Sequence, residues 1–473
     1  MPRTFYERNN RKIEAKDLDI STELEGKIVL PNQYEKKKKL DREIRGKIND
    51  RFYSLLQKTE NTKEEQTVIE NFIKKFLKDE RWYFKEAVDR DDFITNIVND
   101  IFGLGILEKY LEDNTVEEIW VRGTKGIYYE KSGKRFKSEM TFKDDNSVLN
   151  LINKILAPIN RKADESNPIV DGRLADGSRV AVTLPPISLD GPQITIRKFK
   201  KDKFLLSDYI RLASSSKKMA EFLSIAVQGG LNILVAGGTG SGKTTLLNAL
   251  SSEIPIDRGL EHIITVEDSA ELIMFQDFVS GWETKNANTE GQGEIKSSAL
   301  LKHSLRNSPD RIILGEMRDD VAYDVLQAVN TGHDGTMSTI HCESPRGAVE
   351  RFSDLASSSG IIVKNDAMKN FGNTFDLIVY VDKVYNVKTG NFERKITAVT
   401  HVVGSGFTGA QRLNLKADKK EVEPHYVWLE DIYRYNDKEL QFETTGYIPK
   451  DLENRIKIKG YSFPLELFAR GNG

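Results

Sequence analysis

The stretch "GGTGSGKTT", residues 237 to 245, contains the residue types that bind phosphate groups. Its glycines let backbone N–H groups curl around an anion, and its lysine adds positive charge. The apolar run "NILVA" precedes it and the helix-like "TLLNALSSEI" follows, which is the context in which this pattern binds a nucleoside triphosphate. We expect Lys243 to bind the β- and γ-phosphates and Thr244 to ligate Mg²⁺. The predicted nucleotide-binding residues are Gly237, Gly238, Thr239, Gly240, Ser241, Gly242, Lys243, Thr244 and Thr245.

Carboxylates follow two further apolar, strand-like runs. Glu267 lies in "HIITVEDSAEL" (262–272) and Glu316 lies in "RIILGEMRD" (311–319). In a parallel sheet both would lie at the carboxyl ends of strands, where ligands bind. One carboxylate there can orient a water molecule while the other holds the magnesium shell.

The stretch "TGHDGTMSTIHCESP" (331–345) contains two of the six histidines, His333 and His341, and the single cysteine, Cys342. Imidazole and thiolate groups this close in sequence raise the question of a zinc site. However, Cys342 follows His341 directly, which differs from the C-x-x-C and H-x-x-x-H spacings of zinc ligands. The spacing therefore argues against a metal role for these residues.

The elements that must position these residues follow from apolar periodicity. A chain of 473 residues exceeds what one core usually fills, so we expect several domains. The patterns predict an α/β fold, with a parallel-sheet domain preceded by a smaller α+β domain and an N-terminal helical region. The expected divisions are a flexible arm (1–34), a helical region (35–91), the α+β domain (92–198), a linker (199–216), the nucleotide-binding domain (217–405) and a C-terminal extension (406–473).

Composition narrows the function classes. Seventy Lys and Arg against 72 Asp and Glu give a net charge of -2, which argues against a globally basic nucleic-acid binder. The single cysteine cannot form an intramolecular disulfide, which fits a reducing compartment. Charges occupy the start of the chain, and no eighteen uncharged apolar residues follow one another. We therefore expect a cytoplasmic protein that reaches the membrane only through partners.

Four motifs in order, "GGTGSGKTT", "TVEDSAEL", "RIILGEMRD" and "GHDGTMSTIH", resemble the Walker A, Asp box, Walker B and His box of secretion ATPases. These enzymes power type II and type IV secretion and type IV pili. The surrounding segments "GQGEIKSSALLKHSLRNSPD" and "NPIVDGRLADGSRVAVTLPPISLDGPQITIRKF" resemble one branch, the CpaF-like ATPases of tight-adherence (Flp) pili, and their conjugative relatives. Several type II relatives carry a tetracysteine zinc module that this chain lacks, which also favours the CpaF-like branch. The resemblance covers roughly residues 90 to 405.

The resemblance implies a RecA-like P-loop motor domain behind a PAS-like domain, with ATP and Mg²⁺ as cofactors. By its motifs, Glu267 polarises the attacking water and Glu316 shapes the magnesium and water shell, in an order that sequence does not rank. His333 and His341 would form a sensor near the γ-phosphate. Arginines of the preceding domain, or of the neighbouring subunit, would offset charge developing on that phosphate. The matching residues are Arg173, Arg179 and Arg197, and Arg318 would help to transmit the nucleotide state.

The resemblance also implies an assembly: a homohexamer with ATP sites at subunit interfaces, acting on polytopic inner-membrane platform proteins. Its output would be mechanical work in assembling an Flp-like pilus. The alternative within the family is the motor of a conjugative type IV secretion system that exports DNA or protein.

Other classes fit less well. A ring translocase acting directly on nucleic acid would need basic loops with aromatics. The segment "KFKKDKF" (198–204) could supply one, but its neighbours are linker-like. No N-K-x-D signature of a GTPase follows the phosphate loop, and a P-loop kinase does not account for the His box. A purely structural module would be expected to lack the functional residues of these motifs. All four are present: Lys243, Thr244, Glu267 and Glu316. We therefore expect no direct nucleic-acid contact.

Overall fold

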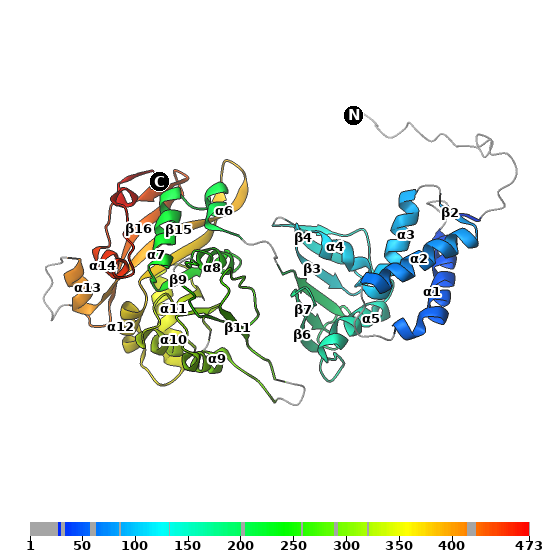
Figure 1. Cartoon of the computed structure of the whole chain (residues 1–473), viewed down its shortest axis with the longest axis horizontal. Coiled ribbons are helices and arrows are strands. Elements are labelled where there is room, and N and C mark those ends of the chain that lie inside the picture. Colours follow the sequence, from blue (N-terminus) through cyan, green and yellow to red (C-terminus); the bar gives the residue numbers. More distant parts are fainter. Residues whose placement is uncertain are drawn as a thin grey trace. The chain divides into compact units, whose positions relative to one another are not determined.

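The chain forms two compact units in the computed structural model, Met1–Phe199 and Lys200–Gly473, and each is described here by itself (Figure 1). The expected flexible arm lies mostly outside the described residues, as do parts of the expected linker. The structure describes residues 27–29, 34–56, 63–84, 87–131, 133–199, 204–256, 259–287, 292–318, 321–413 and 422–472.

The first unit begins with a small helical cluster. Its helices bury the apolar residues whose spacing predicts them, with Leu40, Ile44 and Ile48 of α1 facing Ile69 and Ile73 of α2. A two-stranded parallel pair, β1 with β2, accompanies them. The elements are β1 (Lys27–Val29), α1 (Tyr34–Leu56), α2 (Lys63–Asp79), β2 (Trp82–Phe84), α3 (Ala87–Phe102), η1 (Gly105–Leu107) and α4 (Glu108–Glu112).

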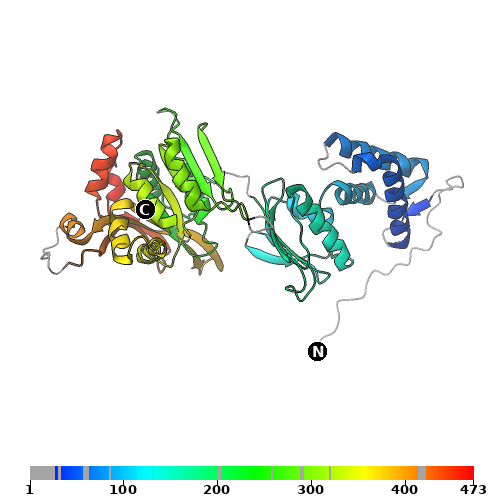
Figure 2. The ribbon, with the colours of Figure 1, turned by 90° about the horizontal axis from the view of Figure 1, so that it is seen from below.

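A six-stranded antiparallel sheet, in the order β5-β4-β3-β8-β7-β6, makes up the rest of this unit. Helix α5 covers one face of it (Figure 2) and begins where Asp144 accepts the N–H of Ser147 at 2.8 Å. Alternate strand residues, such as Val180 and Ile194, are buried on that face. The elements are β3 (Val116–Arg122), β4 (Ile127–Lys131), β5 (Lys134–Lys137), α5 (Asp145–Leu156), η2 (Ala157–Ile159), β6 (Ile169–Arg173), β7 (Arg179–Thr183) and β8 (Gln193–Arg197).

The second unit contains a ten-stranded sheet in the order β11-β10-β12-β13-β9-β14-β15-β16-β17-β18. The strands from β11 to β14 run parallel, and those after β14 are antiparallel. This arrangement confirms the predicted fold class, an α/β domain with a parallel sheet preceded by a smaller α+β domain. The strands are β9 (Ile233–Gly237), β10 (Ile263–Glu267), β11 (Val279–Glu283), β12 (Arg311–Leu314), β13 (Met337–His341), β14 (Leu377–Asn386), β15 (Asn391–Ser405), β16 (Val427–Asn436), β17 (Gln441–Thr444) and β18 (Gly471–Asn472).

Helices cover both faces of the parallel strands, so strands such as β9 are apolar along their whole length (Figure 1). One core holds α7 and α8, and the other holds α10, α11 and α12. The helices of the second unit are α6 (Leu206–Arg211), α7 (Lys217–Gln228), α8 (Lys243–Ser251), α9 (Ser297–Ser304), η3 (Leu305–Asn307), α10 (Val321–Asn330), α11 (Pro345–Ser358), α12 (Lys364–Thr374), α13 (Gly406–Arg412), α14 (Lys450–Ile458) and η4 (Leu465–Phe468).

The segment 406–473, expected as an extension, is built into the ten-stranded sheet of the second unit. Strands β16, β17 and β18 continue the sheet beyond β15, and Ile456 of α14 is fully buried in the core that holds α7. Arg455 of α14 forms ion pairs with Asp334 at 2.6 Å and with Asp376 at the start of β14. Within the described parts of the chain, none of the helices combines the length and apolar character that crossing a bilayer requires.

Candidate nucleotide-binding site

The phosphate loop lies between the buried strand β9 and helix α8, as its sequence predicts. Gly237, Gly240 and Gly242 have φ angles of 158°, 68° and 101°. At Gly240 and Gly242 this is left-handed backbone, which glycine adopts without strain. A β-carbon at Gly237 would collide with the carbonyl oxygen of Val381 on the neighbouring strand β14. The glycines thus allow the tight turn that directs backbone N–H groups to one side.

The residues of this loop fit a bound polyphosphate. The Ser241 hydroxyl is buried and makes no hydrogen bond to any described residue, which leaves a donor available for an anion. No described atom lies within 4 Å of the β-carbon position of Gly238. Helix α8 begins at Lys243, so its N-terminal N–H groups and dipole favour a negative group at the same place. Thr244 and Thr245 are half-buried in its first turn.

The side chain of Lys243 is held over the loop by a loop carbonyl and by His341 of the His box. Its ammonium donates to the Gly238 carbonyl at 2.9 Å and lies 3.1 Å from Nδ1 of His341. Burial lowers the pKa of Lys243, and the nearby Glu316 partly offsets this. A bound phosphate would favour the charged ammonium further, because opposite charge raises the pKa of a lysine.

His341 links Lys243 to the Walker B glutamate. Its Nε2 lies 3.3 Å from Oε1 of Glu316, whose other oxygen accepts from Arg318 at 2.7 Å. Burial is the largest cause that lowers the pKa of His341, and the charge of Lys243 lowers it further, so the site favours the neutral imidazole. A neutral ring can accept from Lys243 at Nδ1 and donate from Nε2 to Glu316. Negative charge placed beside Lys243 would therefore act on these three linked side chains, Lys243, His341 and Glu316.

A pocket of about 400 Å³ opens at this position. It is lined by Thr239, Glu316, Met317, Arg318, His341 and Arg351. Arg351 lies on α11, and its charge contributes to lowering the pKa of His341. No motif in the sequence marked Arg351, because it reaches the site only through the packing of α11 against β13.

Glu267 is the last residue of β10. Its side chain is buried, and its Oε1 accepts the N–H groups of Glu271 and Leu272 at 2.8 and 3.0 Å. Gly315, directly before the Walker B glutamate, packs closely against Glu267, since a β-carbon there would lie 3.0 Å from Cγ of Glu267 and would require that side chain to shift. Glu267 is not among the residues that line the pocket. In this geometry Glu267 holds the Asp-box turn.

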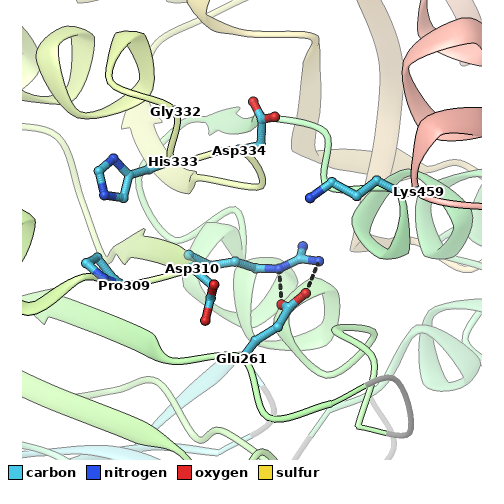
Figure 3. Close-up of a pocket in the computed structure, with 8 residues that line it drawn as sticks. Glu261, Pro309, Asp310, Gly332, His333, Asp334 and Lys459 are labelled. Carbon is cyan, nitrogen blue, oxygen red and sulfur yellow. Dashed lines mark hydrogen bonds and ion pairs between the residues drawn. The ribbon is translucent and has the colours of Figure 1, made fainter.

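The structure separates the two histidines of the His box. His341 ends β13, whereas His333 precedes it, and the five residues of β13 span roughly 16 Å. His333 lines a second pocket, of about 200 Å³, at the amino-terminal edge of the sheet (Figure 3). Its Nδ1 lies 2.9 Å from the Ala328 carbonyl, and the same pocket contains the Arg311–Glu261 ion pair at 2.5 Å. Only His341 therefore contacts the described phosphate-loop residues.

The three arginines predicted to act on the γ-phosphate lie in the first unit, and they align with one another. Arg173 pairs in register with Arg179, and Arg179 pairs in register with Arg197. All three are on the face of the sheet opposite its apolar core. Glu118 of β3 is the next residue in the row, and it faces Arg197. The result is a line of three guanidinium groups across β6, β7 and β8.

Two cations that sequence analysis did not mark contact the phosphate loop from the β14–β15 hairpin. Arg394 donates from Nε to the Gly240 carbonyl at 3.1 Å, and Lys383 lies beside the same glycine. Neither belongs to a nucleotide-binding motif, so only the pairing of β14 with β9 reveals them. The site as a whole can bind a polyphosphate and neutralise its charge.

A family model described as "Type II/IV secretion system protein" matches residues 101–380. The chain is 36% identical over 274 residues to an uncharacterized protein of Methanocaldococcus jannaschii, an alignment that covers 56% of this chain and 38% of that protein. It is 30% identical over 295 residues to the conjugal transfer protein TrbB of Rhizobium radiobacter, covering 62% of this chain and 86% of that one.

Among solved structures, the pilus retraction motor PilT with bound ADP has a similar fold. The TM-score is 0.50 at 18% identity, over 66% of this chain and 86% of that chain. At this identity the likeness concerns the fold alone.

Proposed function

Because the chain belongs to the type II/IV secretion system protein family, we propose that it is a magnesium-dependent ATPase that works as the motor of a pilus or secretion machine. The observation that carries the proposal is the series of contacts from Lys243 through His341 to Glu316. It lies beside a glycine loop in which the buried Ser241 hydroxyl is available to an anion. These contacts join a phosphate-binding group to a carboxylate that follows β12, two strands away from β9 in the sheet. In such a site, binding and terminal-phosphate chemistry are coupled.

In this proposal the phosphate loop holds the β- and γ-phosphates of ATP, and the Thr244 hydroxyl ligates Mg²⁺. Glu316 shapes the magnesium and water shell, and Glu267 polarises the attacking water. His341 reports the state of the γ-phosphate. The aligned Arg173, Arg179 and Arg197 offset charge on the transferred group, from the same or the neighbouring chain of a homohexamer.

The first test is ATP hydrolysis by the purified full chain with Mg²⁺. Lys243→Ala is expected to reduce turnover at least a hundredfold, because it removes the charge that stabilises the transferred phosphate. Lys369→Ala, which changes an exposed lysine of α12, is the control and is expected to hydrolyse ATP as the unchanged chain does. Unreduced hydrolysis by a folded Lys243→Ala protein would remove the motor proposal.

For the machine itself, we propose an Flp-like, tight-adherence pilus, on the basis of the CpaF-like segments of the sequence. The motor would act at the cytoplasmic face of the membrane through polytopic platform proteins, without direct contact to nucleic acid. The relative named as a conjugal transfer protein supports the second candidate, a motor of conjugative type IV secretion, equally well.

Crosslinking in native cells followed by mass spectrometry separates these two. Platform proteins recovered together with small pilin-like subunits would support the pilus motor. A relaxase, a coupling ATPase or channel components would support conjugation instead.

A further inference from the structure

We propose that the aromatic pair Tyr385 and Phe392, near the end of the β14–β15 hairpin, binds the base of the nucleotide. This inference rests on the proposed ATPase function and assigns the specificity-determining side of that same site. The hairpin comprises the end of β14 (Leu377–Asn386) and the beginning of β15 (Asn391–Ser405).

The order of the strands sets the direction in which the nucleotide extends. Lys243 contacts His341 of β13 and is near Glu316, which follows β12, so the γ-phosphate end lies toward those strands. Strand β14 pairs with β9 on the opposite side. A nucleoside triphosphate is an extended molecule, so its ribose and base leave the loop on the β14 side.

The hairpin reaches past the loop on that side. Tyr380 of β14 is in register with Ala236 of β9, which places the following residues beside the phosphate loop. Lys383 and Arg394 form a cross-strand pair, and both lie against the loop at Gly240 or Gly242. The face of the hairpin that carries this pair is therefore the face turned toward the nucleotide.

The next pair on that face is aromatic. Tyr385 and Phe392 are in register with each other, two residues beyond Lys383 and Arg394, or about 7 Å further along the strands. Their rings lie edge to face with centroids 5.3 Å apart, yet they are 50% and 70% exposed. Exposed aromatic rings at this distance from a phosphate site suit a planar base, which stacks on such surfaces.

The hairpin is held in place without these two rings. Asn386 donates to Glu393 at 2.8 Å and accepts the N–H of Lys388 at 2.9 Å, which closes the turn. On the opposite face, Lys395 pairs with Glu393 at 2.7 Å and donates to the Ala213 carbonyl at 2.6 Å. Substitution of the exposed rings therefore leaves the hairpin's own hydrogen bonds intact.

The test compares ATP with inorganic triphosphate, which lacks a base, by calorimetric titration of the full chain in the presence of Mg²⁺. Phe392→Ala is expected to weaken ATP binding about tenfold and to leave triphosphate binding within twofold. Phe392→Tyr, which keeps a ring, is expected to bind ATP within twofold of the unchanged chain. Val387→Ala, at the exposed tip of the same hairpin, is the control and is expected to change neither constant.

Arg394→Met is expected to weaken both ligands, because Arg394 acts on the phosphate loop itself. Equal losses of ATP and triphosphate binding in Phe392→Ala, or no loss in a Tyr385→Ala, Phe392→Ala double variant, would overturn the inference. So would normal ATP binding combined with a loss of ring assembly, since the pair would then be a subunit contact. Failure of the unchanged chain to bind ATP would instead refute the proposed function.

Discussion

Replacing Arg455 with methionine should lower the stability of the second unit, because the buried carboxylate of Asp376 pairs with that guanidinium. Asp376 is only 10% exposed, accepts the N–H of Asn232 at 2.7 Å, and pairs with Arg455, which is 33% exposed. Removing one partner of a buried ion pair costs about 3–5 kcal/mol. Because Arg455 is partly exposed, water can reach the space it leaves, and we expect the lower end, about 3 kcal/mol at pH 7. This corresponds to a melting temperature lower by about 6–12 °C for a unit of this size.

The loss should also depend on pH. Burial raises the pKa of Asp376 in the folded chain. Above the unfolded value of about 3.9, the unfolded chain therefore binds fewer protons than the folded one, and this residue's contribution to stability falls as pH rises. Without Arg455 the pKa of Asp376 in the folded chain rises further, so the pH range over which this residue's contribution to stability falls extends to higher pH. The deficit of Arg455→Met is accordingly expected to be smaller at pH 5 than at pH 8.

Urea unfolding at several pH values measures the deficit, and hydrogen exchange locates it. The amides of Gly335 and Thr336 donate to the Asn232 side chain at 2.9 and 3.0 Å, so they should lose protection first. Adding Asp376→Asn to Arg455→Met removes the unpaired charge and should recover at least half of the loss. A deficit below about 1 kcal/mol, or one equal at pH 5 and pH 8, would refute this reasoning.

Two further predictions concern turnover. Glu316→Gln keeps the size of the side chain but removes the charge beside His341 and Arg318. It should lower kcat about a hundredfold and leave the affinity for ATP within threefold of the unchanged chain. An unchanged kcat in single-turnover assays would argue against a role of Glu316 in the chemistry. Arg197→Ala should lower kcat more than it weakens ATP binding, because charge on the phosphate grows in the transition state. Arg122→Ala, on the same face of the first unit's sheet, is the matched control, and equal losses of rate and binding in Arg197→Ala would indicate a packing role.

The local parts of the fold and site were predictable because their causes are local. The phosphate loop needs only a buried strand, glycines with positive φ and a helix beginning at Lys243, all within one short segment. The helices of the first unit likewise follow from apolar residues repeating at helical spacing. The alternating strand and helix pattern predicted the parallel sheet for the same reason.

The positions of the two histidines show where local prediction stops. They belong to one motif, and adjacency in sequence suggests a shared task. However, β13 runs from the amino-terminal ends of the parallel strands, where His333 lines a pocket (Figure 3), to their carboxyl-terminal ends. His341 is the last residue of β13 and contacts Lys243 there. Residues that are close in sequence lie far apart in space when an extended strand connects them, because each strand residue adds about 3.3 Å.

The sequence by itself determined the family, the phosphate loop and the order of the elements, since these depend on residue types at fixed spacing. Only the tertiary structure decided which distant residues meet there. Packing of α11 on β13 brings Arg351 to the site, and pairing of β14 with β9 brings Lys383 and Arg394 there. Arg455 forms its ion pair with Asp376 because α14 packs into the core of the second unit. Such contacts arise from long-range pairing and burial, whose partners lie far apart along the chain and share no local pattern.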